Sequence, residues 1–195
     1  MPTLHAFGDS FTYGHELSDC PTNTHPSHSK LTYAALFAKY MQLDYKCHAI
    51  GFSANNQILR QIKQADIQPD DSCIVMWSFP VRYALMLEEG YYTLDYEQHR
   101  WWWGYVDQHP EQCLDRSMDA ILAAQTIMDS SKCNWLFMCN NIELQEEIQY
   151  NSKWLNKFRW LFLPKHHEMI NAPDYHPGDS VHKDVFNILR KRYHG

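Results

Sequence analysis

The chain has 195 residues, of which 45% are hydrophobic and 21% charged, and its formal net charge is -6. These values are typical of one globular domain with a sizeable core rather than of a disordered chain. The acidic balance, without a basic tail or stripe, argues against nucleic-acid binding, and no apolar run is long enough to span a bilayer.

Five short apolar runs, each followed by a small or polar residue, divide the chain. They are continuous rather than alternating, which is typical of parallel strands buried on both faces. We therefore predict five strands: Leu4–Phe7, Tyr45–Ile50, Cys73–Trp77, Trp135–Cys139 and Trp160–Leu163.

Helical periodicity fills the segments between these runs. Apolar residues recur at helical spacing over Leu31–Met41, Asn55–Ala65, Leu114–Met128 and Val185–Tyr193. Strands that alternate with helices imply right-handed crossovers and a parallel sheet covered on both faces. The prediction is one α/β domain over residues 1–195, a three-layer α/β/α sandwich whose central parallel sheet has about five strands.

Residues 79–109 do not fit this alternation. Connections in such units usually run about two to six residues, and this one is much longer and rich in aromatic residues. One interpretation is an insertion that contacts substrate through Arg82, Trp101, Trp102 and Trp103. The other is an aromatic insertion that packs on the body of the domain or on another subunit.

The six cysteines form no CxxC pair, so the sequence predicts no structural zinc site. Asp174, His176 and His182 also match no metal-binding motif, and we expect neither a metal nor another cofactor. No basic segment precedes an apolar one at the start of the chain. The expectation is a cytoplasmic protein with reduced cysteines, without a membrane span; a homo-oligomer stays open.

Candidate functional residues follow four of the predicted strands: Ser10, Gly51, Ser78 and Asn140. Sites in open α/β sheets form outside the carboxyl ends of the strands, so these residues should share one edge.

Ser10 needs a base to act as a nucleophile, and a histidine oriented by an acid is the usual one. Asp174 and His176 lie in a loop before the last helix, which also emerges at the carboxyl edge. The plainer interpretation is a turn at Ser10 and a loop histidine at 176. His182 is an alternative base, although it falls inside the last predicted helix.

Three blocks together resemble the SGNH hydrolase, or GDSL esterase/lipase, superfamily: GDSFTYG at residues 8–14, HAIGFSANNQI around Gly51, and DYHPGDSVHKDVFNIL around His176. The resemblance implies the three-layer fold. It assigns Ser10 as the nucleophile and first oxyanion N–H donor, and Gly51 as the second donor. His176 becomes the general base and Asp174 its orienting acid.

Two departures from the family pattern matter. The third strand ends MWSFPVR, without the asparagine that gives the family its third oxyanion donor. Ser78 or Asn55 would have to replace it, and one such donor is worth about 2.7–4 kcal/mol in a serine hydrolase. One residue, rather than the family's usual two, separates Asp174 from His176, and a backbone carbonyl is an alternative orienting group.

The function this predicts is a serine-dependent ester hydrolase with an acyl-enzyme intermediate. The aromatic insertion and the polar mean hydropathy favour a small or carbohydrate-borne ester, such as an O-acetyl group, over a long-chain lipid. The alternative is a catalytically weakened scaffold that binds a glycan or a protein. A flavodoxin-like nucleotide or flavin binder is a third interpretation, but no glycine-rich phosphate loop is present.

Overall fold

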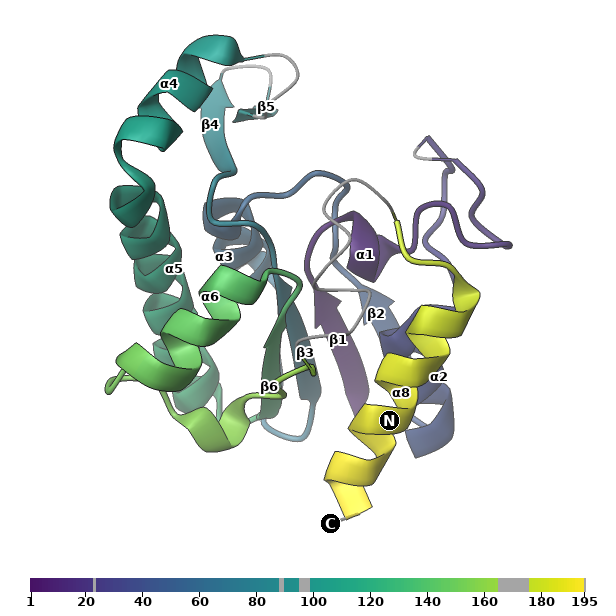
Figure 1. Cartoon of the computed structure of the whole chain (residues 1–195). Helices are drawn as coiled ribbons and strands as arrows, with labels where there is room; N and C mark the ends of the chain where they lie inside the picture. The colour runs from purple at the N-terminus through teal and green to yellow at the C-terminus, as the bar shows by residue number, and fades with distance from the viewer. Residues whose placement is uncertain (23, 88–89, 95–98, 165–175, 195) are drawn as a thin grey trace.

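The computed structural model describes residues 1–22, 24–87, 90–94, 99–164 and 176–194. Its centre is a parallel sheet of four strands in the order β2-β1-β3-β6 (Figure 1). The strand β1 lies inside this sheet, with Ala6 opposite Cys47 of β2 and Ile74 of β3. The strands are β1 (Thr3–Phe7), β2 (Asp44–Cys47), β3 (Ser72–Trp77) and β6 (Asn134–Cys139).

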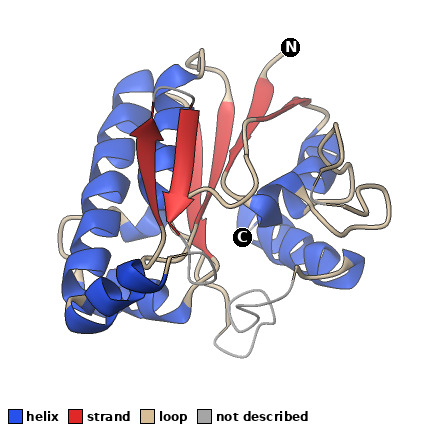
Figure 2. Cartoon of the chain, turned by 90° about the horizontal axis from the view of Figure 1, so that it is seen from above, coloured by secondary structure: helices blue, strands red, loops and turns tan. Residues whose placement is uncertain are grey.

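Helices cover both faces of the sheet, as the view from above shows (Figure 2). The helices α2 (Tyr33–Met41) and α8 (Asp179–His194) pack on one face, against Met76. The helices α3 (Asn55–Gln64) and α5 (Pro110–Ser131) pack on the other, against Trp77. Because successive residues of a strand point to opposite faces, one continuous apolar strand contributes to both cores.

The predicted fifth strand is reduced to a single parallel bridge, between Phe137 and Trp160. Beyond it, the backbone N–H of Leu163 donates to Gln145 Oε1 at 2.9 Å, and its carbonyl accepts from Gln145 Nε2 at 2.6 Å. A side chain therefore takes the place of a neighbouring strand. This segment follows α6 (Ile142–Glu146), the π-helical turn η1 (Glu147–Asn151) and the 3-10 turn η2 (Lys157–Arg159).

The long aromatic segment forms an antiparallel hairpin, β4 (Tyr83–Leu87) and β5 (Gly90–Leu94), followed by α4 (Arg100–Gln108). These elements rise beyond the carboxyl end of the sheet, on the side of α3 and α5 (Figure 1). They pack on α5 through a small apolar cluster around Trp102 and Cys113. The guanidinium of Arg116, from α5, lies over the ring of Trp102 at 5.1 Å.

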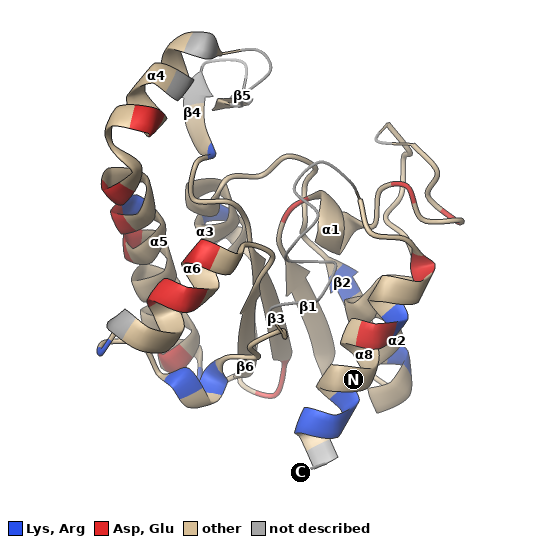
Figure 3. Cartoon of the chain, viewed as in Figure 1, with Lys and Arg blue, Asp and Glu red and all other residues tan. Residues whose placement is uncertain are grey.

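Charged side chains lie on several separate elements, with Lys and Arg on α2, α3 and α8 among others (Figure 3). Among the helices in the described ranges, none combines the length and the apolar character needed to cross a membrane.

Candidate active site

The turn after β1 holds Ser10 at the carboxyl end of the sheet. Ser10 begins a single helical turn, α1 (Ser10–Tyr13), which Asp9 caps by accepting a hydrogen bond from the N–H of Phe11 at 3.1 Å. Gly14 ends this turn in the left-handed region, with φ 86°, which glycine adopts freely. The Ser10 side chain is buried.

Gln61 of α3 holds the backbone at the start of this turn through two hydrogen bonds to Gly8. Its Oε1 accepts from the N–H of Gly8 at 3.1 Å, and its Nε2 donates to the Gly8 carbonyl at 3.0 Å. A Cβ at Gly8 would overlap Thr12 Oγ1, so the chain needs glycine there for close approach. The sequence analysis did not single out Gln61, because one polar residue within a helix gives no signal of its own.

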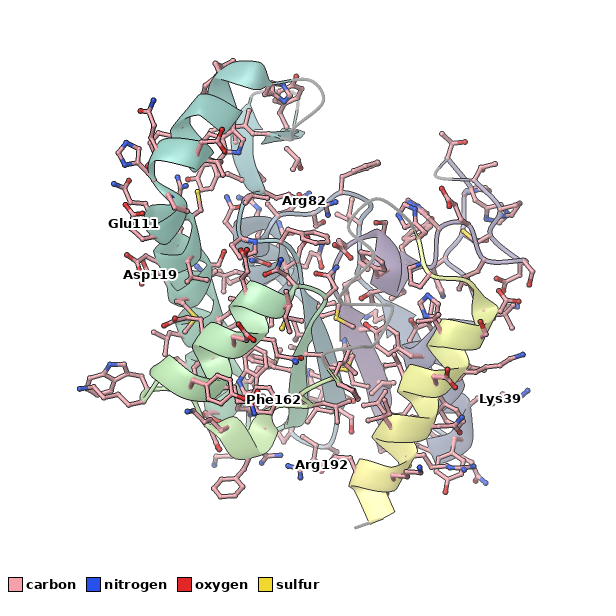
Figure 4. The ribbon with its side chains drawn as sticks, viewed as in Figure 1. Lys39, Arg82, Glu111, Asp119, Phe162 and Arg192 are labelled. Atoms are coloured by element: carbon pink, nitrogen blue, oxygen red, sulfur yellow. The ribbon has the colours of Figure 1, made fainter. Side chains whose placement is uncertain are left out.

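Asp9 is fully buried and joins the ends of three strands. Its Oδ2 accepts from Ser78 Oγ at 2.7 Å, from Arg82 Nη1 at 3.1 Å and from Asn140 Nδ2 at 3.3 Å. Figure 4 labels Arg82 at the carboxyl end of the sheet, between α1 and the β4–β5 hairpin. The expectation that the strand-end residues share one edge is confirmed for Ser78 and Asn140.

The two substitutes considered for the third oxyanion donor are already engaged. The amide of Asn55 donates to the Ser78 carbonyl and to Ser117 Oγ, both at 3.0 Å, while its Oδ1 accepts from the Ser78 N–H at 2.7 Å. The hydroxyl of Ser78 donates to Asp9. In this arrangement the polar hydrogens of both side chains are directed to other residues of the site, and not to an open position beside Ser10.

Gly51 reaches the same edge by way of the loop after β2. The N–H of Ile50 donates to the Gly8 carbonyl at 3.3 Å, which draws this loop toward the nucleophile turn. The backbone of Gly51 lies against the ring of His15, since a Cβ on Gly51 would be 2.6 Å from His15 Cε1.

His176, from the far end of the chain, lies beside the turn that carries Ser10. Its ring centroid lies 5.6 Å from that of Phe11, the residue after Ser10, and 5.9 Å from that of His15. Its Nδ1 lies 3.3 Å from Glu16 Oε1. Asp174, the acid expected from the sequence, lies outside the described residues.

His15 is a second buried histidine that the sequence analysis did not single out. Its Nδ1 has no hydrogen-bond partner among the described residues. Burial lowers the pKa of His15, and the neighbouring His176 lowers it further, whereas Asp9 and Glu16 act in the opposite direction. A lowered pKa favours the neutral form of this ring, which lies between the Gly51 loop and His176.

His182, the alternative base, is instead a buried side chain that packs in the core. It is 1% exposed, and its ring stacks on Tyr33 with a centroid distance of 5.7 Å. Its Nδ1 accepts from the N–H of Tyr33 at 3.3 Å, and burial lowers the pKa of His182 to about 4. A ring held in this way is not available to Ser10.

The tryptophans of the insertion separate into different environments. Trp102 is buried, and its Nε1 donates to the Val81 carbonyl at 2.8 Å, so it packs within the insertion rather than facing a ligand. Trp101 is 65% exposed. The side chain of Trp103 lies outside the described part of the structure. Of the expected substrate contacts within the described residues, Arg82 is the one joined to the turn that carries Ser10, through Asp9.

A hollow of about 340 Å³ lies between α3 and β4, away from Ser10. It is lined by Asn56, Leu59, Arg60, Lys63, Tyr83, Ala84 and Leu85. It shares no lining residue with the site around Ser10 and His176.

No protein-family model matches the sequence, and no curated protein matches it. Solved structures do match in fold. A carbohydrate esterase, whose active site is described as having divergent catalytic and non-catalytic binding functions, aligns over 99% of this chain with a TM-score of 0.62 and 12% identity. A protein described as lipolytic, of the G-D-S-L family from Desulfitobacterium hafniense, aligns over 98% of this chain and 99% of its own, with a TM-score of 0.53 and 11% identity.

An acetyl xylan esterase from the rumen bacterium Butyrivibrio proteoclasticus aligns over 99% of this chain, with a TM-score of 0.51 and 13% identity. The present chain spans 64% of the length of each of these two esterases. The parallel sheet, the serine turn after β1 and the likeness to these structures all indicate the same fold. The chain has the α/β/α fold of the SGNH hydrolases.

Proposed function

We propose that this protein is a serine-dependent ester hydrolase that acts on a small or carbohydrate-borne ester, such as an O-acetyl group. One observation carries the proposal. Ser10 begins a capped turn at the end of β1, and His176, 166 positions later in the chain, packs against the next residue of that turn, Phe11. This neighbourhood supports the assignment of Ser10 as the nucleophile and of His176 as its base.

The reaction would be acyl transfer to water. His176 takes the proton from Ser10 Oγ, which attacks the ester carbonyl. The N–H groups of Ser10 and Gly51 stabilise the oxyanion, and His176 then protonates the departing alcohol. Water, activated by the same histidine, releases the acid and restores Ser10.

Arg82 is the charged group we propose at the substrate side of the site. Its side chain is 18% exposed, whereas that of its partner Asp9 is fully buried. Nη1 of the guanidinium donates to Asp9 Oδ2 and to Ser78 Oγ. The guanidinium has five N–H groups in all, and we propose that one of the others donates to a substrate oxygen. A charged group at this position suits a polar ester better than a long acyl chain. The similarity in fold to carbohydrate esterases supports the same substrate class.

A second candidate is a binding module on the same scaffold. The engaged hydroxyl of Ser78 favours it, because the position that would supply a third oxyanion donor does not offer one. The carbohydrate esterase of similar fold is itself described as having a non-catalytic binding function. The exposed ring of Trp101 would then stack on a sugar.

The test is turnover of p-nitrophenyl acetate, p-nitrophenyl butyrate and acetylated xylan by the wild type, Ser10→Ala and His176→Ala. A fluorophosphonate label, mapped by mass spectrometry, identifies the nucleophile independently of the substrate. Ser130→Ala is the matched control, since Ser130 is exposed on α5.

A label on Ser10, with turnover lost in Ser10→Ala and His176→Ala but kept in Ser130→Ala, would establish the hydrolase. Turnover confined to long-chain esters would reject the proposed substrate class. With no label and no Ser10-dependent turnover, the hydrolase proposal fails, and binding to a glycan array would test the second candidate.

A further inference from the structure

We propose that Glu16, rather than Asp174, is the acid that orients His176. The inference rests on the proposed hydrolase function, because it names the positioning residue of that same site. Its starting observation is the 3.3 Å separation between Glu16 Oε1 and His176 Nδ1. Among the described residues, this is the carboxylate paired with the His176 ring.

The nitrogen that Glu16 contacts is the one that an orienting acid must hold. A histidine that takes a proton from serine uses one ring nitrogen for that purpose, and the acid receives the N–H of the other. A proton on Nδ1, the nitrogen paired with Glu16 Oε1, would leave Nε2 unprotonated and available to Ser10. In this assignment the Glu16 contact favours the tautomer and the ring orientation that the base requires.

A second contact holds the two segments together. The N–H and the hydroxyl of Ser18, two residues after Glu16, donate to the carboxylate of Asp179 at 3.2 and 2.6 Å. Asp179 begins α8, three residues after His176. These bonds lower the pKa of Asp179, which keeps it ionised. The segment that carries Glu16 is thus tied to the segment that carries His176.

The backbone of Glu16 supports the same assignment. Its φ is 66°, in the left-handed region that residues with a Cβ rarely adopt. Such conformations persist where the surrounding structure determines them, and they gather at functional sites. A glycine would fit here more easily, yet the sequence has an acid whose carboxylate reaches the base.

The other titratable groups facing His176 do not compete for this role. His15, which follows the turn that carries Ser10, lies against the His176 ring. His182 of α8 is close enough that His176 contributes to lowering its pKa. Burial lowers the pKa of both histidines, which favours their neutral forms near pH 7. Glu16 is 58% exposed, so water screens its charge and its effect should be smaller than that of a buried acid.

The experiment compares Glu16→Gln with Asp174→Asn in the full chain, using the turnover of p-nitrophenyl acetate. We expect Glu16→Gln to lower kcat by about 10- to 100-fold with little change in KM. The loss should be smaller than the roughly 10⁴-fold caused by removing the charge of a buried triad acid. Asp174→Asn should change kcat less than about threefold. Glu16→Gly should lose the same activity without losing stability, because glycine adopts the left-handed backbone freely.

A second measurement follows the His176 ring by NMR in histidine-labelled protein, and it needs no turnover. We expect Glu16→Gln, but not Asp174→Asn, to raise the fraction of the His176 tautomer protonated at Nε2. Glu16→Asp should restore part of the wild-type tautomer ratio.

The inference is overturned if Glu16→Gln leaves kcat and the His176 tautomer ratio unchanged, or if Asp174→Asn causes both changes instead. A failure of the proposed function looks different, because wild type and Ser10→Ala would then be equally inactive and unlabelled. In that case the tautomer ratio measured by NMR alone decides whether Glu16 orients His176.

Discussion

Arg82 donates from Nη1 to Oδ2 of Asp9 at 3.1 Å, an ion pair whose acid is fully buried next to Ser10 in the chain. The arginine comes from the segment leading into the hairpin, and the acid from the end of β1. A buried carboxylate is costly unless it is paired and hydrogen-bonded, and Ser78 and Asn140 complete its bonds. The pair thus connects the insertion to the turn that holds Ser10.

Arg82→Met should lower the free energy of unfolding by about 3 kcal/mol, because it leaves the Asp9 carboxylate buried without its cation. Urea unfolding followed by circular dichroism measures the change. Lys39→Met is the control. Lys39 is an exposed cation on α2 that points away from the body (Figure 4), and its loss should cost less than about 0.5 kcal/mol. Equal stability of the two variants would contradict the structural importance of the ion pair.

Gln61→Ala should destabilise the protein by about 1–3 kcal/mol, because it leaves the buried N–H of Gly8 without its Gln61 partner and removes one of the two donors to the Gly8 carbonyl. Esterase activity should fall as well, since the freed backbone carries Ser10. Gln64→Ala, at an exposed position of the same helix, is the matched control for helix propensity. If the two variants unfold at the same urea concentration, the hydrogen bonds between Gln61 and Gly8 contribute nothing to stability.

Gly51→Ala should displace His15, since the new methyl carbon would lie 2.6 Å from its ring and that ring is buried. We expect a stability loss of about 1–3 kcal/mol from overpacking, and a fall in kcat of about 100-fold from movement of the Gly51 N–H. Gly104→Ala on α4 is the opposite case, with nothing within 4 Å. It should gain about 0.5–1 kcal/mol, because alanine favours a helix over glycine. A neutral Gly51→Ala would show that this loop has room for a side chain.

The sequence predicts most of the fold because continuous apolar runs and helical periodicity are local signals. The predicted strand Cys73–Trp77 differs from β3 by one residue, and the predicted helix at Leu31 begins two residues later, where Thr32 caps it. The predicted helix Leu114–Met128 is extended to Pro110–Ser131, since the periodic face covers only the buried middle of α5.

The predicted fifth strand shows what local sequence patterns do not determine. Residues 160–163 are apolar and strand-like, but whether they join a sheet depends on which groups meet their backbone. Gln145, 18 positions earlier, supplies those groups at Leu163. A side-chain contact of this kind has no periodic pattern in the sequence.

The candidate site likewise has one part that could be predicted from the sequence and another that could not. That Ser10, Gly51 and Ser78 share one sheet edge follows from topology, because parallel strands end together. The partners of these residues do not follow, because each lies far along the chain: Arg82 for Asp9, Gln61 for Gly8 and Glu16 for His176. Such pairs depend on the folded arrangement of loops rather than on spacing.

Two histidines should make the stability of the protein depend on pH. Burial lowers the pKa of His182 to about 4, and burial together with His5 and Lys46 lowers the pKa of His48 to about 4. In the unfolded chain each should titrate near 6.5. Above pH 6.5 both are neutral in either state, so they add no pH dependence there. Between pH 6.5 and 4 the unfolded chain binds protons that the folded protein does not.

The free energy of unfolding should therefore fall as the pH drops from 6.5 to 4, by up to about 1.4 kcal/mol per pH unit for His182 and less for the partly exposed His48. Asp71 and Asp179, whose pKa values are lowered, should add a further loss only below about pH 4. Urea unfolding at pH 7.5, 6.0 and 5.0 measures the slope. His182→Gln should flatten it, because glutamine can accept the Tyr33 N–H without titrating, whereas His109→Gln at a half-exposed site should not. A slope unchanged by His182→Gln would mean that the buried ring does not resist protonation.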